Sequence, residues 1–456
     1  MGHLSIFAAF RFLAALFLVG CVVGCGDTQN SSASTDNLPV ETETSVLSNS
    51  SAIGSDSDGS SDVSSELAEP LTTAATLDLL TDSWDVYKDR FIQDDGRVID
   101  WEAQDRTVSE GQAYAMLRAV MMDDPATFES TLTWAEVNLE RRDASGVKLD
   151  HLWAWQWGQK VGTAWGILDE TFASDADLDA ATALILAAQR WDRPDYLELA
   201  RTKLADLWTL STVEIPIAVT EQGSDRYFLP GPRAAFQQGL VTYLNPSYFA
   251  PYAFRLFAEV DPDHDWLALI DTSYAALNQS ASISTMGLPS DWVGLDIATG
   301  DYRAVDPLLP LKSVYSFDAF RVWWRVALDY LLFESPEAKD FLVAFLPELE
   351  NQWRSHQFIA AVIDSNGQDI VDYESTAQYA MLHTAFRIVE PAIADDIWSQ
   401  KLFPAYKNGI WDNDTAYYTQ NLAWFGLAST AELVPLWFSE GSEEIGDRSS
   451  ESTQTE

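Results

Sequence analysis

Cysteine is almost absent from this chain, and the positions of the two cysteines exclude most thiol chemistry. Cys21 and Cys25 are the only cysteines among 456 residues. The sequence beyond them therefore has no disulfide, no thiol nucleophile and no cysteine-ligated metal. Histidine is also scarce, and the five histidines are scattered along the sequence, which disfavours a site with several histidine ligands. We expect neither a metal ion nor a cofactor.

Basic residues are few as well. The chain has 27 Lys and Arg against 70 Asp and Glu, which gives a formal net charge of −43. A surface of this sign repels the phosphate backbone, so nucleic acid is excluded as a partner. The glycine-rich phosphate loops, the H-E-x-x-H pattern and, in the folded part, the G-x-S-x-G pattern are also missing. What remains is carboxylate chemistry among aromatic residues, and tryptophan offers a flat ring on which a sugar can stack.

Long apolar runs are limited to the N-terminus, where Phe12–Val23 follows Arg11. This run is short for a membrane-spanning helix and typical of a signal peptide. Two tetrapeptides that end at Cys21 and Cys25 resemble the bacterial lipoprotein box, in which the cysteine is lipidated. We favour Cys25, because polar sequence follows it, with Cys21 as the alternative. An ordinary cleaved signal peptide is the other interpretation.

Composition divides the rest of the chain into three parts. Residues 26–74 and 439–456 are acidic and rich in Ser and Thr, with too few large apolar residues to form a core. We expect a disordered linker and a disordered tail there, a lipoprotein-type signal peptide at 1–25, and one catalytic domain at 75–438. Together, these segments predict an exported protein in the periplasm or on the cell surface, held to a bacterial membrane by its lipid anchor. We expect it to be a monomer.

Helical periodicity dominates the predicted domain, whereas alternating strand patterns are scarce. No repeat of fixed period is visible, which argues against a solenoid. Roughly twelve helices fit the length, and a closed toroid of paired helices is the expected all-α architecture. The expected helices are 128–140, 177–191, 196–210, 265–277, 320–333, 335–345, 376–388 and 394–402.

Three acidic residues each lie near the start of an expected helix. Glu110 follows Ser109, Asp175 follows Ser174, and Asp318 comes two residues after Ser316. Helix capping alone explains each of them, and Ser174 is a good N-cap residue. All three lie among aromatic residues in a chain that is poor in histidine and cysteine, which favours a shared cleft.

The neighbouring polar residues have simpler interpretations. Thr107 and Glu110 have the spacing of a capping box, and Ser174 with Asp177 approximates one. We expect Asp177 and Asp179 to be capping residues or part of a solvated helix surface.

The segment 173–191 resembles the signature of glycoside hydrolase family 8, from which it departs at Ala180, a packing position. Further matching segments follow in the order of the family between about residues 80 and 430, so the resemblance covers the folded unit. Within the family the chain is most similar to the periplasmic cellulase associated with bacterial cellulose synthase. The other matching segments are 96–100, 109–112, 152–158, 245–248, 318–321 and 417–421.

This resemblance implies an (α/α)6 barrel of six inner and six outer helices, and an inverting mechanism. It implies that Glu110 is the general acid, Asp318 the general base, and Asp175 the residue that binds and distorts the sugar at the cleavage site. Inversion places the acid and the base about 6.5–9.5 Å apart, with a water between base and sugar. Because a helix N-terminus lowers the pKa of a carboxyl group, burial and the charge of Asp175 must raise the pKa of Glu110.

The resemblance also implies a set of substrate contacts. One of two tryptophans would stack on a glucosyl ring, with core packing as the alternative for each. A tyrosine would bind the attacking water or the base, and an arginine would fix the base or a sugar hydroxyl, or form a helix salt bridge. The two tryptophans are Trp155 and Trp157, the tyrosine is Tyr248 and the arginine is Arg321. Tyr417 and Tyr418 would be further sugar contacts.

We therefore expect an endo-acting β-1,4-glucanase that cleaves cellulose or a related β-glucan, in cellulose degradation or in bacterial cellulose production. One alternative keeps the fold and mechanism but acts on xylan, chitosan or mixed-linkage glucan. Another is a non-catalytic polysaccharide-binding protein of an exopolysaccharide export system, against which the Glu110 and Asp318 pair argues.

Overall fold

The computed structural model describes residues 71–438, except 161, 163 and 216–224. The predicted signal peptide, both candidate lipidation sites, most of the predicted linker and the acidic tail lie outside the described residues. Within them, no helix is both long and apolar enough to cross a membrane.

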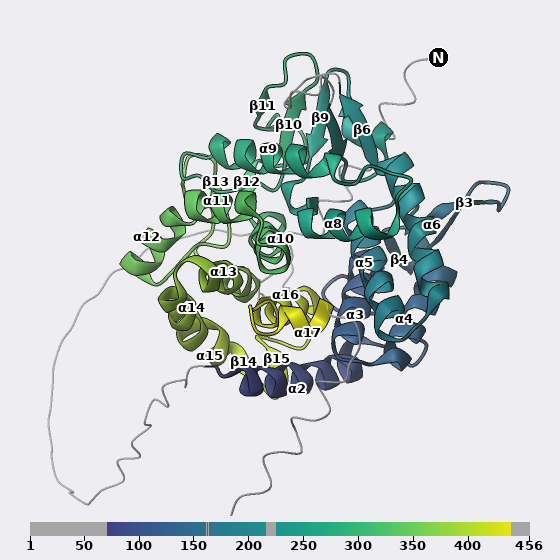
Figure 1. The fold of residues 1–456 in the computed structure, drawn as a ribbon, viewed down its shortest axis with the longest axis horizontal. Helices are drawn as coiled ribbons and strands as arrows, with labels where there is room; N and C mark the ends of the chain where they lie inside the picture. Colours follow the sequence, from purple (N-terminus) through teal and green to yellow (C-terminus); the bar gives the residue numbers. More distant parts are fainter. Residues whose placement is uncertain (1–70, 161, 163, 216–224, 439–456) are drawn as a thin grey trace, which may run out of the picture.

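Six helices pack side by side in a ring (Figure 1), and each contacts the next around the circle. The last of them contacts the first, so the ring is closed within the described part of the chain. The ring helices are α3 (Ser109–Met121), α5 (Ser174–Arg190), α8 (Pro251–Val260), α10 (Phe317–Phe333), α13 (Thr376–Val389) and α16 (Tyr417–Ala428).

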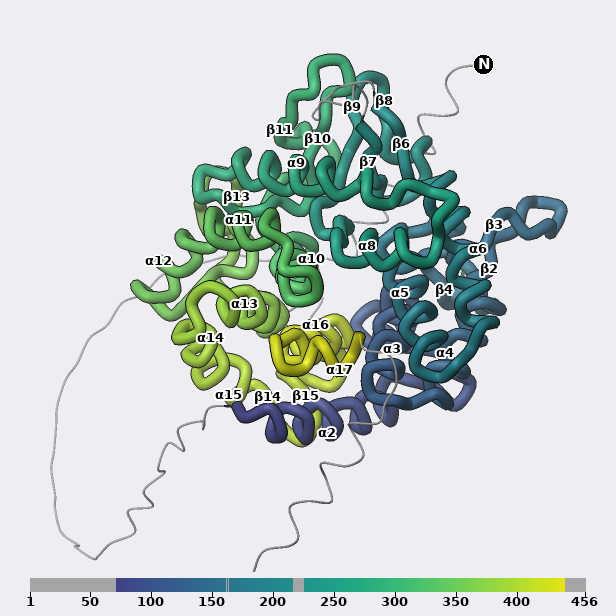
Figure 2. Tube along the Cα trace, viewed as in Figure 1, coloured from purple at the N-terminus to yellow at the C-terminus, as the bar shows by residue number. Residues whose placement is uncertain are grey.

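A second set of helices packs outside the ring, as the tube in Figure 2 shows. Five of the outer helices directly follow the ring helix that they cover, whereas α2 covers α16 and so joins the two ends of the domain. The outer helices are α2 (Thr73–Phe91), α4 (Pro125–Asn138), α6 (Pro194–Ser211), α9 (Ala268–Ile283), α11 (Pro336–Phe345) and α14 (Pro391–Ile397). The remaining helical segments are α7 (Arg233–Phe236), η1 (Pro246–Tyr248), α12 (Pro347–His356), η2 (Trp398–Leu402), α15 (Phe403–Ala405) and α17 (Val434–Phe438).

Helix α2 begins at Thr73, slightly before the predicted start of the domain at residue 75. Thr72 caps this helix by accepting a hydrogen bond from the Ala75 amide at 3.2 Å, and Thr76 and Leu80 are already buried. The folded domain therefore includes residues that the composition had assigned to the linker.

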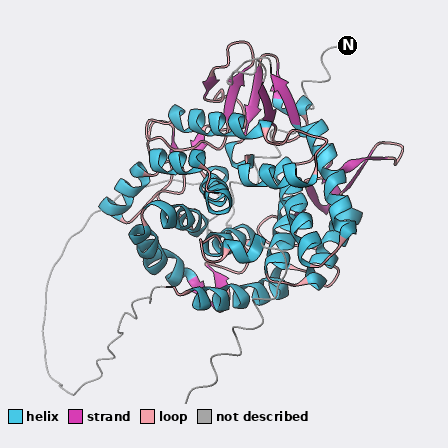
Figure 3. Cartoon of the chain, in the orientation of Figure 1, coloured by secondary structure: helices cyan, strands magenta, loops and turns pink. Residues whose placement is uncertain are grey.

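Short antiparallel strands connect the helices at the margin of the ring (Figure 3). They form a four-stranded sheet in the order β11-β10-β9-β8, a three-stranded sheet in the order β1-β4-β5, and four pairs. The strands are β1 (Thr107–Val108), β2 (Glu140–Arg142), β3 (Lys148–Trp153), β4 (Gln156–Gln159), β5 (Trp165–Asp169), β6 (Thr212–Ile215), β7 (Asp225–Phe228), β8 (Gln237–Gln238), β9 (Val241–Leu244), β10 (Val293–Asp296), β11 (Tyr302–Arg303), β12 (Val314–Tyr315), β13 (Ile363–Asp364), β14 (Tyr406–Lys407) and β15 (Ile410–Trp411).

Small residues allow the ring helices to lie close together. Ala180, Ala181 and Ala183 of α5 are fully buried. A Cβ atom at Gly426 of α16 would lie 2.3 Å from the carbonyl oxygen of Ala380 in α13, so this contact requires glycine. The apolar residues that follow the start of each ring helix thus form a layer of the core beneath Glu110, Asp175 and Asp318.

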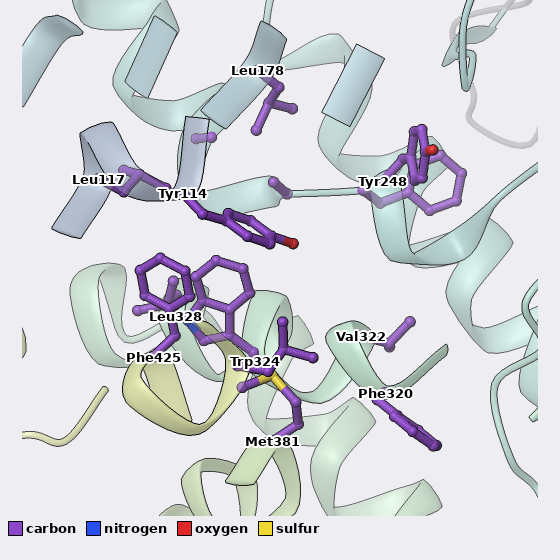
Figure 4. Close-up of a cluster of buried hydrophobic side chains, with 14 of the residues drawn as sticks. Tyr114, Leu117, Leu178, Tyr248, Phe320, Val322, Trp324, Leu328, Met381 and Phe425 are labelled. Atoms are coloured by element: carbon purple, nitrogen blue, oxygen red, sulfur yellow. The ribbon is translucent and has the colours of Figure 1, made fainter. Parts of the chain in front are cut away.

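Aromatic rings fill the centre of this apolar layer. Figure 4 shows Tyr114 of α3 beside Trp324 of α10 and Phe425 of α16. The centroid of the Tyr114 ring lies 6.5 Å from that of Trp324 and 5.3 Å from that of Phe425. These contacts join three ring helices directly below the polar groups described next.

The short helix α17 lies across the other end of the ring (Figure 1). Arg190, the last residue of α5, donates to the carbonyl of Leu436 at 2.7 Å. Trp437 donates to the carbonyl of Ala428, the last residue of α16, at 3.0 Å. The C-terminal ends of these ring helices are therefore covered, and their N-terminal ends form the opposite face.

Candidate active site

The three carboxylates singled out by the sequence occupy the same position in three ring helices. Glu110, Asp175 and Asp318 are each the second residue of their helix, in α3, α5 and α10 respectively. A helix N-terminus carries partial positive charge and unpaired amides, which suits a carboxylate. The three side chains consequently lie at one end of the ring.

The guanidinium of Arg321 joins all three. Its Nη1 donates to Oε2 of Glu110 at 2.9 Å and to Oδ2 of Asp175 at 2.7 Å. Its Nη2 donates to Oδ1 of Asp318 at 2.9 Å and to the hydroxyl of Ser247 at 3.0 Å. We name Glu110, Asp175, Asp318 and Arg321 the carboxylate cluster.

Each carboxylate of the cluster has a second partner. Tyr417 donates to Oε1 of Glu110 at 3.3 Å, and Asn245 donates to Oδ2 of Asp318 at 3.0 Å. Oδ1 of Asp175 accepts from the backbone amide of Ala176, in its own helix, at 2.9 Å. Asp175 is thus tied to its helix, whereas Glu110 and Asp318 are held by side chains from other elements.

Glu110 is placed to hold a proton near neutral pH. Burial, which is the largest cause, and the negative charges of Asp175 and Asp318 raise its pKa to about 7, although Arg321 acts in the opposite direction. Its side chain is only 14% exposed. Burial therefore outweighs the stabilisation of the charged form by the helix N-terminus and by Arg321.

Asp318 is the carboxylate most open to solvent, with 35% of its side chain exposed against 3% for Asp175. Burial and the charge of Asp175 raise its pKa above the ordinary value, while Arg321 and the hydrogen bond from Asn245 lower it. Water can reach this group, as a base that activates water requires.

The structure corrects the expectation for Asp179. It is buried one turn below Asp175, and both of its carboxylate oxygens accept from Arg325, which lies one turn below Arg321 on α10. We name Asp179 and Arg325 the lower pair. Its two members are far apart in the sequence, so nothing local distinguished Asp179 from a solvated acidic residue.

Asp177 is also buried rather than exposed. One of its oxygens accepts from the Trp153 amide at 3.1 Å and lies 3.7 Å from Nζ of Lys203. Burial raises the pKa of Asp177 to about 7. It joins α5 to β3 and α6 instead of capping its own helix.

The predicted side-chain caps are also wrong. Ser174 is the first residue of α5, and its hydroxyl donates to the carbonyl of Leu229 at 2.5 Å. The hydroxyl of Thr107 donates to the carbonyl of Val98 at 2.7 Å. Both hydroxyls satisfy loops that pack on the helix starts, and the N-cap residues of α3 and α5 form no side-chain cap.

The tryptophans divide between the core and the rim. Trp155 is buried, which fits the core-packing alternative, and its carbonyl accepts from the Ser109 amide at the start of α3 at 3.0 Å. Trp157 is half-buried and stacks on Trp165, with 5.2 Å between ring centroids. Trp165, which the sequence analysis did not single out, is 45% exposed. Of the three, it offers the most surface to solvent.

The predicted tyrosines all lie near the cluster. Tyr248 is buried, and the centroid of its ring lies 5.4 Å from the Arg321 guanidinium carbon. Tyr417 contacts Glu110, as described above. Tyr418 donates its hydroxyl to the carbonyl of Phe317, the first residue of α10, at 2.6 Å. The structure thus places Tyr248 and Tyr417 against charged groups and Tyr418 against the backbone.

Sequence reasoning missed four polar residues around the cluster. The Asn245 and Ser247 side chains lie within the matched segment 245–248, so that segment held the signal, but only Tyr248 was chosen from it. The hydroxyl of Tyr114 accepts from Arg321 at 3.4 Å. Asp291 bonds to the first turn of α10. Neither of the last two had a sequence pattern that marked it.

In the described ranges, no group of three or more His, Asp or Glu residues is arranged to hold a metal ion. The cluster instead combines two carboxyl groups of different solvent exposure, a third fixed carboxylate and one guanidinium. This arrangement can supply one acid and one base.

Comparison with known proteins gives a consistent family. A family model described as glycosyl hydrolases family 8 matches residues 64–431. An endoglucanase of Pseudomonas fluorescens (strain SBW25) is 34% identical over 243 residues, which cover 53% of this chain and 58% of the relative. An endoglucanase of Xanthomonas axonopodis pv. citri is 35% identical over 249 residues, which cover 54% and 60%. The alignments thus span less than two thirds of either relative.

Solved structures agree over a larger share of the chain. The endo-1,4-D-glucanase from Vibrio fischeri ES114 superposes with a TM-score of 0.63 at 25% identity, over 76% of this chain and 93% of the other. Endoglucanase Cel10 from Klebsiella pneumoniae, described as a family 8 glycosyl hydrolase, superposes with a TM-score of 0.60 at 26% identity, over 77% and 99%.

Proposed function

The chain belongs to the glycosyl hydrolases of family 8, and from this premise we propose that it cleaves internal β-1,4-glucosidic bonds of cellulose or a related β-glucan with inversion. The observation that carries this proposal is the meeting of three helix-start carboxylates on the single guanidinium of Arg321. The endoglucanase names of the similar proteins support the choice of substrate.

Glu110 acts as the general acid in this proposal. It gives its proton to the glycosidic oxygen while the bond from that oxygen to the anomeric carbon breaks. A pKa of about 7 keeps the proton available near neutral pH.

Asp318 acts as the general base. It takes a proton from a water molecule whose oxygen forms the new bond to the anomeric carbon from the opposite face. Glu110 and Asp318 bond to different nitrogens of the same guanidinium, so both carboxylates are held beside one cation. Inversion needs about 6.5–9.5 Å between the acid and the base.

Asp175 holds and distorts the sugar at the cleavage site in this proposal. Its hydrogen bond to its own helix fixes one oxygen, and Arg321 fixes the other. Such a rigid carboxylate suits a sugar hydroxyl that must be held in one place. We assign Tyr248, Tyr417 and Tyr418 to the lining of the same subsite, and Trp157 to an adjacent one.

We also interpret the closed ring of six helices and its outer set as the (α/α)6 barrel expected from the sequence. The cleft then lies at the N-terminal ends of the ring helices, opposite α17. This placement is supported by the positions of Glu110, Asp175 and Asp318 in their helices.

Reducing-sugar release on a panel of polymers tests the substrate. We expect activity on soluble cellulose or another β-1,4-glucan and less on xylan, chitosan and mixed-linkage glucan. Absence of activity on every β-1,4-glucan would refute the proposal. Proton NMR of the first product tests inversion, which predicts the α-anomer initially, whereas an initial β-anomer would contradict it.

We further propose export and lipid anchoring at Cys25, with Cys21 as the alternative, and a monomeric enzyme that acts in the periplasm or at the cell surface. The support is the N-terminal sequence alone. Labelling with a radioactive fatty acid in cells should mark the wild type and not the Cys25→Ser variant. Label retained by that variant would move the anchor to Cys21, and a wild type without label would refute lipidation.

A further inference from the structure

The first turn of α10 is capped by a residue from outside the helix. Asp291 lies in the segment between α9 and β10, and its Oδ1 accepts from the amides of Ser316 at 3.1 Å and of Ala319 at 2.9 Å. Its Oδ2 accepts from the Ser316 hydroxyl. Ser316 is the N-cap residue of α10, but its own side chain makes no cap.

This arrangement matters because of where Asp318 lies. An aspartate in the first turn can fold back and accept from the free amides of its own helix. Asp175, at the same position of α5, does so through the Ala176 amide. In α10 the Ala319 amide is instead taken by Asp291, and both oxygens of Asp318 face other side chains, Arg321 and Asn245.

We propose that Asp291 is a positioning residue for the general base: by capping α10 in place of Asp318, it holds the Asp318 carboxylate towards the cleft. The inference rests on the proposed function, in which Asp318 activates water. Asp291 is itself buried, and its side chain bonds to Ser316 and Ala319 rather than to a member of the carboxylate cluster.

An asparagine can replace Asp291 without loss of this geometry. Its carbonyl oxygen accepts from the same two amides, and its NH2 group donates to the Ser316 hydroxyl. Burial and the charge of Asp318 raise the pKa of Asp291 to about 8, so the native side chain is already close to neutral. Asp291→Asn therefore preserves the cap, and Asp291→Ala removes it.

The test measures kcat and KM of both variants on soluble β-1,4-glucan. We expect Asp291→Ala to lower kcat by about 10²-fold with little change in KM, because the base is misplaced while substrate binding is kept. We expect Asp291→Asn to restore most of kcat. Asp124→Ala is the matched control, since Asp124 caps α4 at the far end of α3 from Glu110. It should lower the melting temperature and leave kcat unchanged.

Two results would overturn the inference. One is an Asp291→Ala enzyme that melts as early as Asp124→Ala but keeps the kcat of the wild type. The other is an Asp291→Asn enzyme as impaired as Asp291→Ala. Glu110→Gln is assayed in parallel: if it remains active, the proposed function itself fails, whereas its inactivation beside an active Asp291→Ala refutes only the role of Asp291.

Discussion

Two arginines lie one turn apart on α10 and bind different numbers of buried carboxylates. Arg325 bonds both oxygens of a single carboxylate, that of Asp179, and the hydroxyl of Tyr252 at 2.8 Å. Arg321 bonds three carboxylates, those of the carboxylate cluster. Both guanidiniums are buried.

The difference separates a structural role from a chemical one. In the lower pair one positive charge balances one negative charge, although burial raises the pKa of Asp179 above its ordinary value. In the cluster three carboxylates share one guanidinium, so burial makes it favourable for one of them to keep a proton near neutral pH. A proton held in this way is what a general acid needs. In addition to burial, which is the largest cause of the raised pKa of Glu110, the excess of negative charge distinguishes the cluster from the lower pair.

The largest expected effect comes from breaking the lower pair. Arg325→Met leaves the Asp179 carboxylate buried without a cation and should lower the free energy of unfolding by about 3–5 kcal/mol. Replacing both residues, as Asp179→Leu with Arg325→Met, removes the unpaired charge and should restore most of that loss. Urea unfolding of the three proteins measures this. An Arg325→Met variant as stable as the wild type would show that the lower pair does not stabilise the fold.

The same substitution at two positions of α5, one turn apart, distinguishes the carboxylate cluster from the lower pair. Asp175→Asn should lower kcat/KM by about 10²-fold, because it alters the group that we propose positions the sugar. Asp179→Asn should lower the melting temperature more and kcat/KM much less, since it leaves Arg325 without its carboxylate. Kinetics and thermal unfolding of both variants decide this. If folded Asp179→Asn lost as much kcat/KM as Asp175→Asn, the lower pair would contribute to catalysis as much as the carboxylate cluster does.

The dependence of kcat/KM on pH tests the excess charge. Activity should fall as the pH rises through about 7, because Glu110 loses its proton, and should fall at acidic pH where Asp318 gains one. In Asp175→Asn the loss of a negative charge lowers the pKa of Glu110, so the basic limb should move to lower pH. A basic limb that stays in place or moves upward in this variant would contradict the electrostatic argument.

The smallest expected effects concern the neutral partners of the two arginines. Ser247→Ala removes a hydroxyl from Arg321, and Tyr252→Phe removes one from Arg325. Each should cost about 1 kcal/mol of stability. Only Ser247→Ala should also lower kcat, by a few-fold, because Arg321 bonds to Asp318, the proposed base. Equal kcat values in the two variants would count against a role of Arg321 in orienting that base.

The sequence predicted the cluster better than its surroundings. Glu110, Asp175 and Asp318 could be found because a carboxylate at a helix start is a local pattern. Arg325 is 146 residues from Asp179 in sequence, and only the packing of α5 against α10 brings them together, so the lower pair could not be found in this way. The hydroxyls of Ser174 and Thr107 fit a capping pattern, but they donate instead to backbone carbonyls of loops that pack on the helices.

The fold shows the same limit. Amphipathic spacing located most of the long helices. It missed α2, which has 19 residues, as well as α8, α12 and α16. The longest of the described strands, β3, has 6 residues, so the strands are too short for an alternating pattern to be visible. Burial of Trp155 was likewise undecidable from sequence, because an aromatic residue suits a core and a sugar platform equally well.

The titration of the Glu110 carboxyl shows whether this group holds a proton at neutral pH, as the proposed acid must. Carbon-13 NMR of protein labelled at glutamate carboxyl carbons, with Glu110→Gln to assign the signal, follows this group alone. Burial of Glu110, together with the negative charges of Asp175 and Asp318, predicts a midpoint of about pH 7. A midpoint near the ordinary glutamate value of about 4.3 would show that Glu110 is ionised at neutral pH, and would contradict its role as the acid.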